Sequence, residues 1–283
     1  MISHFEKPRW QLLGIPVLFM ERRVADVLDQ LKDYGLYLDN GGIYTSAYGR
    51  RLDLMYHIDL LQLFHLQFPV PPSLSLKLGQ MAELGKDYFT GAWRGRAFEV
   101  ASLIGLDKPG LEILDATASR QHFRWFEELR WALLANLLLG RGDDLVGICD
   151  YVQPDLFFDE GGFDRSKADN AAYQLVAKHL RREVICLDDA AVKLVETSRG
   201  RRAKLIWKTL QAAQVGDVRI VSKSIQGILE IFRDKEFDPD GRALTSWDAS
   251  ILWNIAEAVN CLPVNVPEEL RNFVITRASL GIT

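Results

Sequence analysis

Trp207-Lys-Thr-Leu-Gln-Ala-Ala-Gln-Val-Gly-Asp217 and Trp131-Ala-Leu-Leu-Ala-Asn-Leu-Leu-Leu-Gly-Arg-Gly-Asp143 are the two stretches that decide the fold. Each starts at a Trp, continues as an apolar helical segment, stops at a Gly and restarts at an Asp before a second apolar segment. Gly adopts the left-handed backbone that closes a helix, and Asp accepts hydrogen bonds from the first free amides of the next one. Both stretches therefore predict helical hairpins.

Helical spacing continues through most of the chain. Apolar residues recur at i, i+3, i+4 and i+7, as in Val24, Val27, Leu28 and Leu31, and no segment shows the sustained alternation of a strand. Helices are expected near residues 24–39, 52–68, 73–104, 119–140, 143–152, 166–180, 184–198, 201–213, 217–233, 246–260 and 267–278. Tetratricopeptide-type repeats use a similar Gly-Asp joint, but no fixed period recurs here. The predicted class is predominantly all-α, an irregular helical-hairpin array or bundle.

Two regions that contain prolines refine this prediction. Pro16 keeps Ile15 out of the helical region, so Leu12–Phe19 is expected to be a short extended segment near the N-terminus. Pro69, Pro71 and Pro72 remove amide donors and end the apolar 52–68 helix. We therefore expect an N-terminal helical part over residues 1–72 and a helical-hairpin domain over residues 73–283, packed together as one globular unit.

Composition narrows the classes of partner. The 34 basic and 38 acidic residues give a net charge of -4, which is too small to draw the protein onto nucleic acid or an anionic membrane. The apolar stretch Leu12–Met20 is shorter than a membrane-spanning helix and lacks a signal-peptide cleavage site. Cys149, Cys186 and Cys261 form no ligand pair and are expected to be small buried residues in a reducing compartment. A cytoplasmic protein without nucleic-acid or membrane partners is predicted.

No metal, cofactor or catalytic motif is complete. The Asp238-Pro-Asp240-Gly241 stretch resembles part of a calcium loop, but the position that needs a bidentate Glu is Trp247. A turn before a helix capped by Thr245 or Ser246 is expected instead, with Asp248 closing a capping box. The pairs Asp143-Asp144 and Asp188-Asp189 lack a further carboxylate one turn on and are interpreted as helix caps. Nucleophile elbows and phosphate-binding or dinucleotide-binding glycine loops are absent from the sequence.

Histidine spacing offers one catalytic alternative. No two histidines are four residues apart, as a metalloprotease helix requires, and His57 and His65 are expected to be core or boundary residues of one apolar helix. Arg51 and His57 nevertheless resemble the Arg-x4-6-His motif of helical HEPN-type ribonucleases, in which both residues act on RNA. The polar residue that commonly follows the Arg is Leu52 here.

One acidic and aromatic segment exceeds what a connecting loop needs. Four acids and three phenylalanines surround the Gly161-Gly162 pair, and we expect this segment to contact a protein partner, with a basic toxin domain as the candidate that its acids would attract. Its predicted contact residues are Asp155, Phe157, Phe158, Asp159, Glu160, Phe163 and Asp164.

The stretch from Trp125 to Leu262 resembles the larger all-helical immunity proteins of bacterial polymorphic-toxin systems. The shared features are a Trp-led helix at Trp125, the Gly-Arg-Gly-Asp-Asp break before residue 145, the Trp207–Asp217 helix and an Ala-rich helix before Leu262-Pro263. The resemblance implies a cytosolic protein that binds and neutralises one cognate toxin without catalysis. A helical scaffold or adaptor is the first alternative, and a ribonuclease that uses Arg51 and His57 is the second.

Overall fold

The structure is a computed structural model of the chain. It describes residues 7–39, 62–63, 65–69, 130, 133–134, 136–138, 140, 145–146, 149, 164–239 and 243–280, without the side chains of 30–39 and 164–166. The elements are α1 (Arg9–Leu12), α2 (Val17–Asp39), α8 (Asp164–Leu180), α9 (Ala190–Thr197), α10 (Arg201–Gln214), α11 (Val218–Lys235), α12 (Trp247–Ala258), α13 (Glu268–Arg271) and the 3-10 helix Ala278–Leu280. None of the described residues lies in a strand, which confirms the all-α class.

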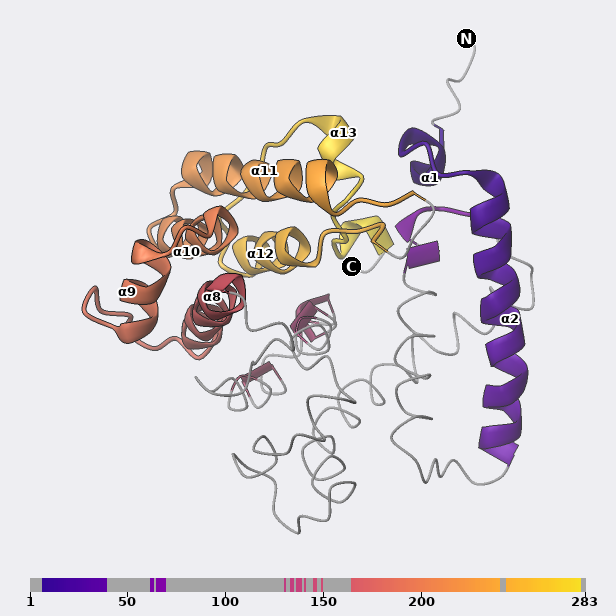
Figure 1. Cartoon of the computed structure of the whole chain (residues 1–283), viewed down its shortest axis with the longest axis horizontal. Helices are drawn as coiled ribbons and strands as arrows, with labels where there is room; N and C mark the ends of the chain where they lie inside the picture. The colour runs from indigo at the N-terminus through magenta and orange to yellow at the C-terminus, as the bar shows by residue number, and fades with distance from the viewer. Residues whose placement is uncertain are drawn as a thin grey trace.

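Helices α8 to α13 form the main body of the described fold (Figure 1). Helices α10 and α11 make the most extensive contact in it; α12 packs against both of them, and α8 packs against α10 and α9. The centre of this body is a cluster of fully buried side chains, among them Tyr173, Ile206, Leu210, Ile225 and Ile228. On α10 and α11 the buried residues recur at helical spacing, so each of these helices buries one face and leaves the other to solvent, whereas α8 and α12 are buried on most sides.

The joint between α10 and α11 confirms the hairpin that the sequence predicts. Gly216 has a φ of 72°, and its amide donates a 3.3 Å hydrogen bond to the carbonyl oxygen of Ala213. The Asp217 carboxylate then accepts a 3.0 Å hydrogen bond from the amide of Ile220 and caps α11. Gly140, in the second of the two decisive stretches, also has a positive φ, of 66°. Glycine therefore closes the helix at both predicted positions.

The N-terminal segment differs from the prediction. Leu12–Phe19 is not extended: Leu12 ends α1, Ile15 and Pro16 form a short link, and α2 begins at Val17. The amides of Phe19 and Met20 donate to the carbonyl oxygen of Pro16, and a proline is tolerated at the start of a helix because no amide donor is needed there. The other end of α2 was predicted correctly, since Asp39 is its last residue.

A second apolar cluster joins the N-terminal helices to the main body. Met20, Val24 and Val27 of α2 are buried together with Leu63 and Leu66, and Leu244 from the segment before α12 belongs to the same cluster. The indole ring of Trp10 contacts Phe68 edge to face, with ring centroids 5.3 Å apart. The elements on either side of the three prolines therefore share a core at this point.

Two predicted helices are shorter in the structure. The helix expected over residues 184–198 begins only at Ala190, because Asp189 caps it and pairs with Lys178. Val184 and Leu187, in the preceding loop, are 89% and 77% exposed, and Cys186 is exposed too, contrary to the expectation that all three cysteines are buried. The helix expected over residues 267–278 is a single turn, Glu268–Arg271, followed by irregular backbone.

The irregular backbone after α13 is held by other parts of the chain. The carbonyl oxygen of Asn272 accepts a 3.0 Å hydrogen bond from the ring of His65. The carbonyl oxygen of Phe273 accepts a 2.9 Å hydrogen bond from the amide of Ser246. Ile275 donates its amide to Ser250 Oγ at 3.0 Å and accepts from Asn254 at 2.9 Å. In a longer helix these backbone amide and carbonyl groups would bond to one another. Here they bond to other parts of the chain, so tertiary hydrogen bonds take the place of helical ones.

Several expectations fall outside the described residues. The helix predicted over 73–104 lies outside them completely, and those over 119–140 and 143–152 lie outside them in part. Within the predicted 52–68 helix, Gln62, Leu63 and His65 are helical, whereas Leu66 and Gln67 form a turn with a φ of 57° at Gln67.

Candidate binding groove

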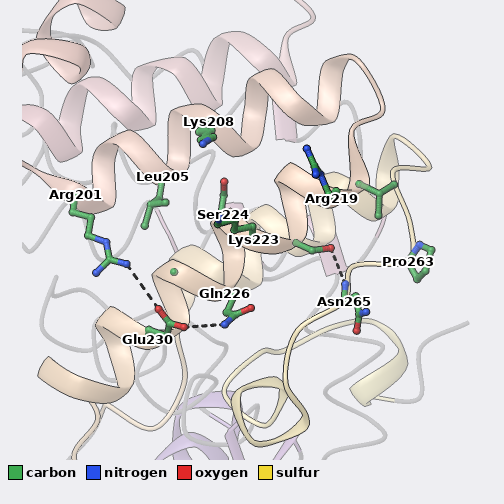
Figure 2. A pocket seen from close by; sticks show the side chains of 13 residues that line it. Arg201, Leu205, Lys208, Arg219, Lys223, Ser224, Gln226, Glu230, Pro263 and Asn265 are labelled. Carbon is green, nitrogen blue, oxygen red and sulfur yellow. Dashed lines mark hydrogen bonds and ion pairs between the residues drawn. The ribbon is translucent and has the colours of Figure 1, made fainter.

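A groove of about 820 Å³ lies along α10 and α11, and the segment Pro263–Asn265 closes one end of it (Figure 2). Four of the residues that line it are cationic, and one, Glu230, is acidic. This ratio contrasts with the whole chain, whose net charge is -4. The groove is therefore a local basic surface on an acidic protein.

Helical periodicity explains which side chains reach the groove. On α10, Arg201, Leu205 and Lys208 follow at i, i+4 and i+7 and share one face. On α11, Arg219 and Lys223 share a face in the same way, and Gln226 and Glu230 continue it toward the end of the helix. The opposite faces of both helices are buried in the main core.

The floor of the groove depends on the absence of a side chain at Gly227. A Cβ atom built there would lie 3.0 Å from Leu205 Cδ1, closer than ordinary van der Waals contact. Leu205 thus lies directly against the backbone of α11, and the two helices approach closely at this position. Gly227 is buried and Leu205 half-buried, so the floor is apolar while the rims are charged.

The two ends of the groove differ in charge. At one end Arg201 Nη2 lies 3.8 Å from Glu230 Oε2, and Gln226 donates a 2.9 Å hydrogen bond to Glu230 Oε1 (Figure 2). Toward the other end, Lys208, Arg219 and Lys223 are exposed, and none of them forms an ion pair with any residue that the structure describes. The first end is close to neutral, whereas the second has three positive charges that no described acidic residue compensates.

The short wall at the basic end is fixed to α11. The amide of Asn265 donates a 2.8 Å hydrogen bond to Ser222 Oγ, drawn as a dashed line in Figure 2. Val264 and Val266, on either side of Asn265, are buried in the main core. Pro263 and Asn265 are exposed and line the groove. The wall is therefore an anchored part of the fold.

A buried ionic network sets the position of α10 next to the groove. Arg202, adjacent to Arg201, pairs with Glu236 and lies 3.5 Å from Asp248 Oδ2. Arg130 Nη1 lies 3.2 Å from Oδ1 of the same aspartate. Burial by itself raises the pKa of Asp248, but the charges of Arg130 and Arg202 and a hydrogen bond from Tyr173 lower it below its usual value.

Asp248 therefore does not close a capping box, as the sequence suggested. Ser246 alone provides the cap for α12, by accepting from the amide of Ala249 at 3.4 Å. The Asp248 carboxylate points into the interior and ties α12 to α8 and α10. The network is a structural feature, because the Asp248 carboxylate on α12 binds Tyr173 of α8 and Arg202 of α10.

His65 was predicted to be a core residue, and the structure confirms it. Its ring is fully buried, Nε2 donates to the carbonyl oxygen of Asn272 at 3.0 Å, and Nδ1 lies 3.1 Å from Ser279 Oγ. Burial, with the positive charge of Arg9 nearby, lowers the pKa of His65 to about 3, although the hydrogen bond to Asn272 opposes the shift. The ring is thus held neutral and satisfied.

The residues that the sequence nominated as sites are placed as follows. Asp155, Phe157, Phe158, Asp159, Glu160 and Phe163 lie outside the described residues, and Asp164 is the first residue of α8. Arg51 and His57 also lie outside them, so the ribonuclease hypothesis remains a prediction. Asp189 is a helix cap, as expected: its carboxylate accepts from the amide of Ala191 at 2.8 Å. In the part of the chain that the structure describes, no group of three or more His, Cys, Asp or Glu is placed to hold a metal ion.

Sequence reasoning missed the groove. The spacing of Arg219 and Lys223 was visible, but an exposed charged face is ordinary on a helix surface. Nothing in the sequence showed that Lys208 from the preceding helix would face the same space, or that Pro263–Asn265 would close it.

No family model, curated protein or solved structure shows significant similarity to this chain. None of the described helices is both long and apolar enough to cross a membrane. The proposals below accordingly rest on the geometry of the groove and on the sequence.

Proposed function

We propose that this protein is a non-catalytic cytoplasmic binding protein that holds a partner in the groove between α10 and α11. The observation that supports this function is the set of three exposed cations, uncompensated within the described part of the chain, on the rim of an apolar-floored concavity. Like charges gathered at one place repel one another, which costs stability, whereas a bound anionic group removes that cost. Apolar surface below a few directional polar groups is the general composition of a ligand site.

The groove is also preformed by the fold. The Asn265–Ser222 hydrogen bond holds its short wall, and the Arg202–Asp248 pair holds the start of α10. A partner that binds here does not have to pay for ordering the two helices, so more of the contact energy appears as affinity.

Site-specific photocrosslinking in the native host tests this function. A photoreactive amino acid at Lys208, inside the groove, should give a discrete crosslinked protein adduct. The same substitution at Lys204, which is exposed on α10 but does not line the groove, is the matched control. Equal adducts from both positions, or none from Lys208, would contradict the proposal.

The specific form of this function that we propose is neutralisation of a cognate bacterial toxin. The resemblance to immunity proteins includes the Trp207–Asp217 stretch, which is the end of α10 and the cap of α11, and both helices form the groove. A gene directly beside the gene for this protein should then encode a toxin. Expressing that neighbour alone should stop growth, and co-expressing this protein should restore it; growth arrest that persists would argue for the scaffold or adaptor alternative.

The acidic segment that the sequence nominated remains the predicted second contact with such a toxin. Charge reversal at Asp159 and Glu160 should slow association in a salt-dependent manner, because rim charges act on encounter rates. Removing the rings of Phe157, Phe158 and Phe163 one at a time should speed dissociation with little change in melting temperature. If all three substitutions unfold the protein instead, these phenylalanines belong to the core.

A further inference from the structure

We infer that the partner segment held in this groove is an acidic stretch of a protein, with its carboxylates at Lys208, Arg219 and Lys223 and an uncharged side chain over Leu205. The inference rests on the proposed function and names the chemistry of the partner. It follows from the unequal ends of the groove, from the nature of the cations and from the cap on α11.

The difference in charge between the two ends determines at which end of the groove the acidic residues of a bound segment lie. Around Arg201 and Glu230 the charges compensate each other at 3.8 Å, so that end offers hydrogen bonds without a net field. The three cations at the other end, which pair with none of the described residues, attract negative charge. A segment with acids at one end and apolar or polar uncharged residues at the other matches this arrangement.

The cations favour carboxylates over a single phosphate. Lys208 comes from α10, and Arg219 and Lys223 come from successive turns of α11, so their charges are distributed along the groove. A compact phosphate site usually adds free backbone amides at a helix N-terminus. At the start of α11 the Asp217 carboxylate already accepts from the amide of Ile220, and its negative charge opposes an anion there. Several separate carboxylates suit this groove better.

The charge balance also favours a protein over a nucleic acid. Non-specific binding of nucleic acid comes from Lys and Arg side chains that neutralise several backbone phosphates along an extended basic surface. This groove has three cations without a counter-charge among the described residues, in a chain whose net charge of -4 repels a polyanion at long range. A short acidic peptide segment meets the local field without requiring a larger basic surface.

Binding of defined peptides by fluorescence anisotropy, with the full-length protein, tests the inference. The probe is a fluorescein-labelled dodecapeptide of Glu-Glu-Leu repeats, and its Gln-Gln-Leu counterpart and a labelled oligouridylate of equal length are compared with it. The groove variant is Lys208→Glu with Lys223→Glu. The matched control is Lys204→Glu with Lys235→Glu, which also changes one exposed lysine on each helix, by the same charge, outside the groove.

We expect the acidic peptide to bind the parent protein at low salt and to lose about tenfold in affinity on the groove variant, while the control changes less than about threefold. A Lys-Lys-Leu peptide should bind the groove variant better than it binds the parent protein. Circular dichroism melting of both variants establishes that they are folded. If the double variant does not fold, the single variant Lys223→Gln is measured in its place. It removes one exposed charge and should still show a measurable part of the loss in affinity.

Three results overturn the inference. The first is that the Glu and Gln peptides bind equally well, or that neither binds. The second is an equal loss of peptide affinity in the groove and control variants. The third is tighter binding of the oligouridylate than of the acidic peptide through the same lysines. If the Lys208 crosslink forms in the host while the acidic peptide fails to bind, only the chemistry inferred for the partner is wrong. If neither is seen, the proposed function is wrong as well.

Discussion

The hydroxyl of Tyr173 donates a 2.6 Å hydrogen bond to Oδ1 of Asp248, in the interior of the main body. Burial, together with the negative charge of Asp248, raises the pKa of Tyr173 well above its ordinary value, so the tyrosine remains a proton donor. The same carboxylate is paired with Arg130 and Arg202, and Arg202 also pairs with Glu236. One buried aspartate therefore connects α8, α10 and α12.

Replacing Asp248 by Asn should lower the free energy of unfolding by about 3 to 5 kcal/mol, because two arginines lose a buried counter-charge. Tyr173→Phe should cost less, about 1.5 to 3 kcal/mol, since it removes one hydrogen bond to a charged acceptor. Urea denaturation followed by circular dichroism measures both. A loss below about 1 kcal/mol for Asp248→Asn would show that the network does not stabilise the fold.

Acid should weaken the fold through His65. Its folded pKa of about 3 lies below the ordinary value of 6.5, so the unfolded chain takes up the proton first. The contribution of His65 is therefore complete above pH 6.5 and declines as the pH falls toward 3. Between pH 7 and 5 this amounts to about 2 kcal/mol.

Denaturation midpoints of the parent and of His65→Gln over this range measure the effect. The variant should show a shallower decline, because Gln does not titrate. Some decline should remain, since burial also lowers the pKa of His179. Identical slopes in the two proteins would contradict the assignment of His65 as a buried neutral ring.

Gly216→Ala should destabilise the α10–α11 hairpin by about 1 to 2 kcal/mol. The cause is backbone strain alone, because φ is 72° and no heavy atom lies within 4 Å of a Cβ built there. Gly216→Asn should cost less, since Asn tolerates the left-handed region. Thermal unfolding of the two variants tests this order, and an equal loss for both would contradict it.

A thiol reagent should distinguish one exposed cysteine from two buried ones. Cys186 is exposed in the loop before α9, whereas Cys149 and Cys261 are buried, and burial raises the pKa of Cys261. A thiol reagent such as dithionitrobenzoate should label one cysteine rapidly in the native protein and all three in guanidinium. Cys186→Ser should abolish the rapid phase; rapid labelling that persists would place another thiol at the surface.

Local sequence determined the helical class and the hairpin joint. At Gly216 and Asp217 the residue types alone define the structure, because a left-handed exit and an amide-accepting cap act within a few positions of the chain. The bounds of α10 and α11 were predicted within two residues for the same reason. The caps at Asp189 and Ser246 are equally local, and both were among the expectations.

Tertiary structure decided the hydrogen bonds and ion pairs between residues that are far apart in the sequence. The predicted helix over 267–278 is reduced to Glu268–Arg271, because the carbonyl groups of Asn272 and Phe273 bind His65 and Ser246. Asp248 became the centre of an ionic network instead of a cap once Arg130 and Arg202 packed beside it.

The groove has the same origin. Lys208, Lys223 and Asn265 lie on three separate segments, and they meet because Gly227 lets α10 and α11 approach closely and Ser222 anchors the loop. Helix caps and turns depend on atoms a few residues apart, which the sequence presents directly. Charge compensation and concavity depend on side chains that only packing brings together.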